Sequence, residues 1–177
     1  MTTDELDRLS SDFQDFHSRF GSFFARSEPR EASLRYLRGL LAPMQRKNCW
    51  QMAEAVGEQD PQPLQRLLYS AQWDEDEVRD ELQRFVVEQF GDEAGIGVVD
   101  ETGFLKKGTK SVGVKRQYTG TAGKVENRQV GVFLTYFDPG GRTFLDRRLY
   151  LPQEWCADER RREEAQVPDD VDRKSVV

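Results

Sequence analysis

The sequence contains few of the residues on which many catalytic and metal sites depend. It has one histidine and two cysteines in 177 residues, and Cys49 and Cys156 lie in different segments with no Cys-x-x-Cys spacing. We therefore expect neither a zinc site nor catalysis by a Cys-His or Ser-His pair. His17 lies beside an apolar helical stripe with no acid or thiol placed to act with it, so we interpret it as a rim or partly packed residue.

Long apolar runs are also missing. No stretch of about 18 apolar residues occurs, and the N-terminus, MTTDELDRLSSDF, is acidic where a signal peptide would be basic and then apolar. These absences predict a soluble, cytoplasmic protein with no membrane partner. Charged residues make up 33% of the chain and apolar residues 37%. A chain of this length buries roughly 70% of its unfolded surface, which allows one medium core or two small ones.

The first half of the chain has apolar residues at alternating intervals of three and four, which predicts helices. Asp60 and Asp74 are expected N-caps, and the composition changes after Gly91. We expect residues 1–91 to form a helical domain. The stripes expected to face its core include Leu6, Leu9, Phe13, Phe16, Phe20 and Phe23, and then Leu34, Leu37, Leu40 and Leu41.

Two of the predicted helices are short and joined by a turn that contains Gly57. Such a pair could be a helix-turn-helix, with Gln62, Gln65 and Arg66 available to contact DNA. An ordinary helical hairpin is the favoured alternative, because helix pairs are common in helical domains.

The second half of the chain has apolar patterns that predict strands. Ile96–Val99 is predicted to be a short strand buried on both faces, with Asp100 at its end. Alternation with polar residues predicts a strand at Val112, Val114 and Tyr118 and a second one at residues 130–136. A turn at Asp138 then leads to a third and last strand in residues 142–151. We expect an α+β fold in which residues 92–152 contain a three-stranded, mainly antiparallel meander. Residues 153–177 are strongly charged with little to bury, which predicts a partly disordered tail.

A basic, glycine-rich segment follows Asp100. Residues 104–128 hold seven cations and one acid, a balance of +6 in a chain whose total is −6. The glycines allow the backbone to approach a phosphate chain that the cations attract. The candidate DNA-binding residues are Lys106, Lys107, Lys110, Lys115, Arg116, Lys124 and Arg128.

Asp100 is the candidate metal ligand, because phosphoryl transfer by a pair of divalent metals needs carboxylates beside a basic groove. Other acids have more ordinary interpretations. Glu101 would face away if the strand continued, Asp138 is expected in a turn, and Asp146 is expected to pair across the sheet with an arginine. On its own, Asp100 would be interpreted as a cap or an ion-pair partner.

The residues around Asp100 resemble a known family. VVDETGFLKKGTKSVGVKRQYTGTAGKVENRQVGVFL closely resembles the first catalytic strand of insertion-sequence DDE transposases, in the branch with a VDETGFLKKG motif followed by a GVxRQYxGTAGxxEN motif. The resemblance extends through LYLPQEW, at Leu149 to Trp155. It also reaches back over FFARSEPREASLRYLRGLLAPMQRKNCWQMAEAVG, so it covers most of the chain.

The resemblance implies an RNase H-like catalytic fold, preceded by a helical region that helps to hold transposon DNA. It implies that Asp100 is the first of the acids that hold the catalytic Mg²⁺ ions. The second aspartate and the final glutamate of the family have no counterparts before Val177, and the family pattern is lost near Asp172. An incomplete RNase H-like domain, from a truncated or frameshifted reading frame, is therefore expected.

Two functions stay open. The first is a truncated transposase fragment that binds DNA but is inactive alone, because one acid would bind Mg²⁺ weakly. The alternative is a non-catalytic module that occupies transposon ends, or pairs with a full-length transposase and inhibits it. Exposed sheet surfaces would also favour self-association. A third and less favoured hypothesis is an active magnesium nuclease completed by Asp138, Asp146 or acids of the tail.

Overall fold

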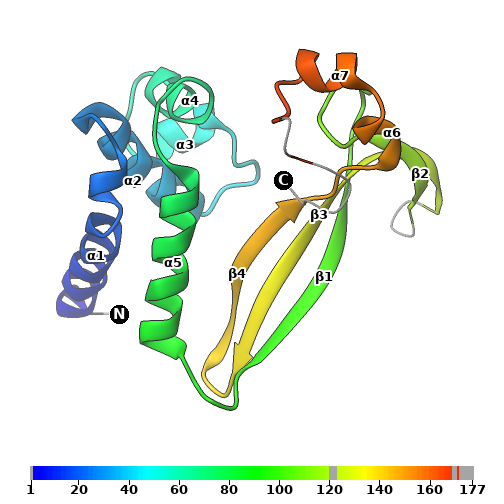
Figure 1. Ribbon diagram of the computed structural model, residues 1–177. Helices are drawn as coiled ribbons and strands as arrows, with labels where there is room; N and C mark the ends of the chain where they lie inside the picture. The colour runs from blue at the N-terminus through cyan, green and yellow to red at the C-terminus, as the bar shows by residue number, and fades with distance from the viewer. Residues whose placement is uncertain (1, 120–122, 169–170, 172–177) are drawn as a thin grey trace. The chain divides into compact units, whose positions relative to one another are not determined.

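The structure is a computed structural model that describes residues 2–119, 123–168 and 171. It divides into two compact units, Met1–Glu81 and Leu82–Val177, and each unit has a hydrophobic core of its own. Helices form the first unit and an antiparallel sheet dominates the second (Figure 1). The predicted α+β class is confirmed. The domain limits at residues 91 and 152 stay predictions.

The first unit is helical, and its helices begin where the sequence provides caps. Oδ1 of Asp60 accepts a hydrogen bond from the backbone N–H of Gln62 at 2.8 Å, and Oδ1 of Asp74 accepts one from Glu77 at 2.9 Å. The predicted cap at Asp74 is confirmed, whereas the N-cap position of the helix Gln62–Tyr69 is Pro61, one residue after the predicted Asp60. The elements are α1 (Thr3–Ser18), the short helix η1 (Gly21–Phe23), α2 (Ser27–Leu41), α3 (Cys49–Ala55), α4 (Gln62–Tyr69) and α5 (Glu75–Phe90), which continues into the second unit.

The core of the first unit lies where α2, α3 and α4 meet. Met52 and Ala53 of α3 are each 1% exposed, and Leu64 of α4 is fully buried. Gly39 lets α2 approach α3, because a Cβ atom at this position would lie 2.8 Å from Cβ of Met52. The short helices α3 and α4 therefore pack together on α2. Their use as a helix-turn-helix stays a hypothesis.

Parts of the predicted apolar stripes are wrong as core positions. Leu41 is 73% exposed, and Leu6 and Leu9 are 48% and 57% exposed. The buried residues of α2 are Ala32 and Gly39. Periodicity identifies the apolar side of a helix but not which neighbour covers it, and in α2 the close contact with α3 is made by Gly39 instead of Leu41.

Within the described residues, the sheet of the second unit has four antiparallel strands, with β3 in the middle. Arg128 of β3 is opposite Leu105 on one side and Lys115 on the other, whereas Val132 is opposite Glu101 and Arg148. One edge of β3 therefore pairs with β1, and its other edge pairs with β2 and then with β4. The strands are β1 (Ile96–Leu105), β2 (Lys115–Thr119), β3 (Lys124–Asp138) and β4 (Gly141–Leu149).

The sheet differs from the predicted meander in two ways. The strand pattern predicted around Val112–Tyr118 corresponds to β2, but among the described residues β2 and β4 pair with the same edge of β3 and β1 pairs with its other edge. The first strand is also longer than Ile96–Val99 and is not buried on both faces, since Ile96 is 62% and Val99 is 68% exposed. Among the described residues β1 pairs only with β3. A short apolar run cannot distinguish such an edge strand from a central one.

Two short helices follow the sheet, α6 (Gln153–Cys156) and α7 (Glu159–Glu164). Trp155 is 1% exposed, and it forms a small core with the fully buried Leu151 and with Val167. The expectation that the segment after residue 152 has little to bury is therefore wrong for residues 153–167. A few apolar residues are enough because the basic segment contributes Val112 to the same core.

Within the described residues, no helix combines the length and the apolar character that a membrane crossing requires.

Candidate functional site

Asp100 lies in the middle of β1, not at the end of a strand as predicted. It is exposed, and its Oδ1 accepts a hydrogen bond from the backbone N–H of Glu101 at 2.8 Å. Asp100 is opposite Phe133 of β3, which is in turn opposite Arg147 of β4. The carboxylate is therefore held on an open sheet face, with an aromatic ring and then a cation beside it.

The pairing register shows which side chains share this face. Side chains directly opposite each other in antiparallel strands lie on the same face, and successive residues alternate. The backbone N–H of Lys106 donates to the carbonyl of Asn127 at 2.8 Å, so the ladder continues one residue beyond β1. Arg116 of β2 is also opposite Asn127. We call this surface the Asp100 face, and its members include Asp100, Phe104, Lys106, Arg116, Asn127, Phe133 and Arg147.

Aromatic rings cover the middle of the Asp100 face. The ring centroid of Phe133 lies 6.3 Å from that of Phe104 and 5.4 Å from that of Phe144. Phe144 is 62% exposed and Phe104 is 45% exposed. Asp100 and Lys106 are six residues apart, which in a strand is about 20 Å. The acid and the cations are therefore distributed along one face and do not form one compact cluster.

Glu101 and Arg128 lie on the opposite face, as their positions in the register require. Their side chains approach to 3.8 Å. Gly103 leaves room for this contact, because a Cβ atom there would lie 3.2 Å from Cδ of Arg128. The prediction that Glu101 faces away from Asp100 agrees with this register. Arg128 is separated from the cations of the Asp100 face.

The seven candidate DNA-binding cations differ in their partners. Lys115 forms an ion pair with Glu154, and Lys124 with Glu126 at 2.6 Å. The hydrogen bond from Lys124, together with the charges of Lys124 and Arg116, lowers the pKa of Glu126. In the part of the chain that the structure describes, no ion pair is formed by Lys106, Lys107, Lys110 or Arg116.

The basic segment is fixed by residues that sequence reasoning did not single out. The indole Nε1–H of Trp155 donates to the carbonyl of Val114 at 2.8 Å. The guanidinium carbon of Arg161 lies 3.7 Å from the centroid of the same ring, and its Nη2 donates to the carbonyl of Thr109 at 2.5 Å. Trp155 belongs to the LYLPQEW motif, which was the one signal that could have identified it.

The other acids considered as metal ligands are engaged elsewhere. Oδ1 of Asp138 accepts hydrogen bonds from the N–H groups of Gly140 and Gly141 at 2.6 and 2.8 Å, which confirms its place in the turn. Asp146 lies 3.7 Å from Arg148, an arginine of its own strand. Across residues 2–119, 123–168 and 171, no three His, Cys, Asp or Glu side chains converge to hold a metal. These residues by themselves do not fit a pair of Mg²⁺ ions.

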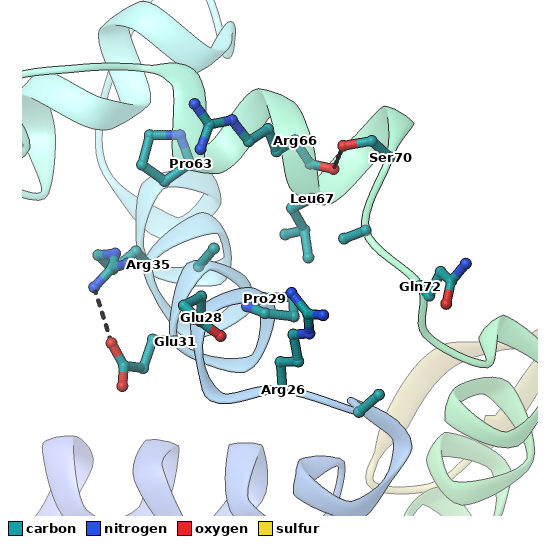
Figure 2. A pocket seen from close by; sticks show the side chains of 13 residues that line it. Arg26, Glu28, Pro29, Glu31, Arg35, Pro63, Arg66, Leu67, Ser70 and Gln72 are labelled. Atoms are coloured by element: carbon teal, nitrogen blue, oxygen red, sulfur yellow. Dashed lines mark hydrogen bonds and ion pairs between the residues drawn. The ribbon is translucent and has the colours of Figure 1, made fainter.

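The first unit has a groove of about 710 Å³ between α2 and α4. Arg26, Arg35 and Arg66 line it together with Glu28 and Glu31 (Figure 2). Arg35 lies 3.8 Å from Glu31 (Figure 2). Arg66 donates to the side chain of Gln62. The groove therefore has mixed charge, and part of it is already neutralised.

His17 is more deeply placed than predicted, at 7% exposed. Its Nε2 lies 2.7 Å from Oγ of Ser33, which donates its own hydrogen to the carbonyl of Arg30. Burial, followed by the charges of Arg30 and Arg38, lowers the pKa of His17. The neutral imidazole therefore links α1 to α2, which is a structural role.

Comparisons with known proteins agree with the motifs around Asp100. Residues 15–176 match the family described as DDE superfamily endonuclease. The chain is 34% identical over 117 residues to the probable transposase for insertion sequence element IS701 of Microchaete diplosiphon. That alignment covers 66% of this chain but 30% of the relative, so the chain spans under a third of the relative's length. No solved structure matches the chain. The match across most of its length shows that the chain belongs to the DDE superfamily endonucleases, and the predicted relation to insertion-sequence transposases is confirmed.

Proposed function

We propose that this chain is a DNA-holding part of an insertion-sequence DDE transposase, with an RNase H-like sheet. One observation carries the proposal: Asp100 shares a sheet face with Lys106 and Arg116. The roughly 20 Å between Asp100 and Lys106 corresponds to about six steps of a duplex strand at 3.4 Å per step. A DNA backbone lying along the Asp100 face would therefore meet the cations and the carboxylate together.

The cations without ion pairs supply the attraction for DNA. Each lysine or arginine that neutralises a phosphate releases condensed counterions, so binding is strong at low salt and weak at high salt. Such contacts do not distinguish sequences. Preference for transposon ends therefore requires base contacts, for which the helical unit with Gln62, Gln65 and Arg66 is the candidate.

For catalysis, we propose that Asp100 is the first metal-holding acid and that the described residues do not cleave DNA alone. One exposed carboxylate leaves Mg²⁺ with most of its water ligands and cannot fix a second ion. Glu101 cannot help, because it lies on the other face. The companion acids must come from residues outside those described or from another polypeptide.

The test uses the full chain and a labelled DNA duplex. Fluorescence anisotropy at increasing salt is expected to show binding whose association constant falls steeply with salt. Asp100→Asn should bind DNA at least as well as the native chain, because it removes a negative charge from the face. Nicking of supercoiled DNA with Mg²⁺ should be absent for both. Nicking that Asp100→Asn abolishes would show that the acid set is complete and would contradict the inactive part of the proposal.

A second candidate function, inhibition of a full-length transposase, is favoured by the open edge of β1. Among the described residues this edge has no paired strand, and Val98 and Val99 are 43% and 68% exposed beside it. Unpaired edges readily add a strand from another chain. Co-purification with a tagged full-length transposase, lost in Val99→Lys, would support this function. Equal capture of both forms would exclude the β1 edge as the contact.

A further inference from the structure

A pocket of about 900 Å³ lies in the second unit between the basic segment and the helices α6 and α7. Its cations come from both sides: Lys110, Lys115 and Arg116 from the basic segment, and Arg161 from α7. Asn127 of β3, which is opposite Arg116, also lines the pocket.

The pocket also contains three acids, but each already has a partner. Glu154 pairs with Lys115, Oδ1 of Asp158 caps α7 by accepting from the N–H of Arg161, and Glu164 pairs with Arg160 at 2.9 Å. Lys110 and Arg116, in contrast, form no ion pair with any described residue. The pocket therefore presents unneutralised positive charge beside an amide that can donate hydrogen bonds.

The shape of the pocket depends on a short, well-defined loop. Gly113 has φ of +74°, and a Cβ atom there would lie 2.7 Å from the carbonyl oxygen of Tyr150. Gln129 donates to the carbonyl of Val112 at 2.7 Å. Together with the bonds from Trp155 and Arg161, these contacts hold the backbone between Lys110 and Arg116 in one conformation.

We propose that this pocket is a binding site for one phosphate of the DNA backbone, with Lys110 and Arg116 as its ligands. Arg161 is a positioning residue, because its guanidinium is occupied by the Trp155 ring and the carbonyl of Thr109. Glu154, which lines the same pocket, is an anion that repels the phosphate. This inference rests on the proposed DNA-binding function and assigns it to a defined site.

The experiment measures the affinity of the full chain for a duplex of arbitrary sequence as a function of salt. Lys110→Gln and Arg116→Gln should each reduce the slope of log K against log salt by about 1. Glu154→Gln should raise the affinity by about 1.5-fold to fivefold, the range for one exposed charge interaction. If Glu154 has a purely structural role, Glu154→Gln should not raise the DNA affinity.

Two neighbouring arginines of α7 provide a matched pair. Arg161→Gln removes the contacts to Thr109 and Trp155, whereas Arg160→Gln makes the same change of charge at a side chain that is 88% exposed. Arg161→Gln should weaken DNA binding about tenfold more than Arg160→Gln. Arg161→Lys should recover little of the lost DNA affinity, because a lysine lacks the planar surface that stacks on the Trp155 ring. Thermal unfolding of each variant separates misfolding from loss of the site.

The outcomes distinguish the site from the function. If the native chain shows no salt-dependent binding, the proposed function fails. The other outcome is that the native chain binds DNA while Arg161→Gln and Arg160→Gln have equal DNA affinities and Glu154→Gln has the affinity of the native chain. In that case the pocket is not the phosphate site, and only this inference is overturned.

Discussion

Replacing Trp155 by alanine tests whether the helices after the sheet hold the basic segment. The side chain is 1% exposed, and its core includes Leu151 and Val167. Removal of a large aromatic residue from such a site costs about 3–5 kcal/mol in the free energy of unfolding. Trp155→Phe keeps most of the apolar contact but leaves the carbonyl of Val114 without its donor, which costs about 1–3 kcal/mol.

Trp50 is the matched control, because it is 62% exposed on α3 in the other unit. Trp50→Ala should change the free energy of unfolding by no more than about 0.5 kcal/mol. Urea unfolding followed by far-ultraviolet circular dichroism gives the global values. Hydrogen exchange then locates the effect, since amide protection in residues 109–115 should fall in Trp155→Ala and stay unchanged in Trp50→Ala.

Two results together would contradict a role for Trp155 in holding the basic segment. These are an unfolding free energy for Trp155→Ala equal to that of Trp50→Ala, and unchanged protection of residues 109–115. In that case the contacts from Trp155 would be incidental, and the basic segment would hold its conformation through β2 and β3 alone.

Three further predictions concern single residues. Burial lowers the pKa of His17 below 6.5 in the folded state, so the unfolded state binds the proton at a higher pH than the folded state does. The contribution to stability should be complete above pH 6.5 and should fall as the pH drops toward the lowered pKa. Denaturation curves at several pH values should show a weaker pH dependence for His17→Gln. Gly113→Ala should destabilise the second unit by more than about 1 kcal/mol in urea unfolding, because φ is positive and the carbonyl of Tyr150 blocks the new methyl group; an unchanged midpoint would contradict this. Asp74→Ala should cost about 1 kcal/mol through the lost hydrogen bond to the N–H of Glu77, while Asp74→Asn should largely preserve stability.

Local signals in the sequence were enough for the elements that depend on a few neighbouring residues. Asp74 caps α5 because its short acidic side chain reaches a free N–H group in the first turn. Asp138 forms its turn for a similar reason. The motif around Asp100 was long enough to identify the family.

The candidate site needed more than local information. Whether Asp100 shares a face with Lys106 and Arg116 depends on the register of three strands, and a shift of one residue would move each side chain to the other face. The different environments of Lys115, which is paired with Glu154, and Lys110, which is not, depend on a helix that lies about forty residues further along the chain.

The sequence by itself determined the helical first half, the strand-rich second half, the cation-rich segment and the family. Only the tertiary structure decided that β1 is an exposed edge strand, that Trp155 and Arg161 fasten the basic segment, and that Arg128 is directed to Glu101 on the opposite face. The physical reason is that capping, turn formation and charge density act between residues close in the chain. Burial, strand register and ion pairing depend instead on which distant segments meet.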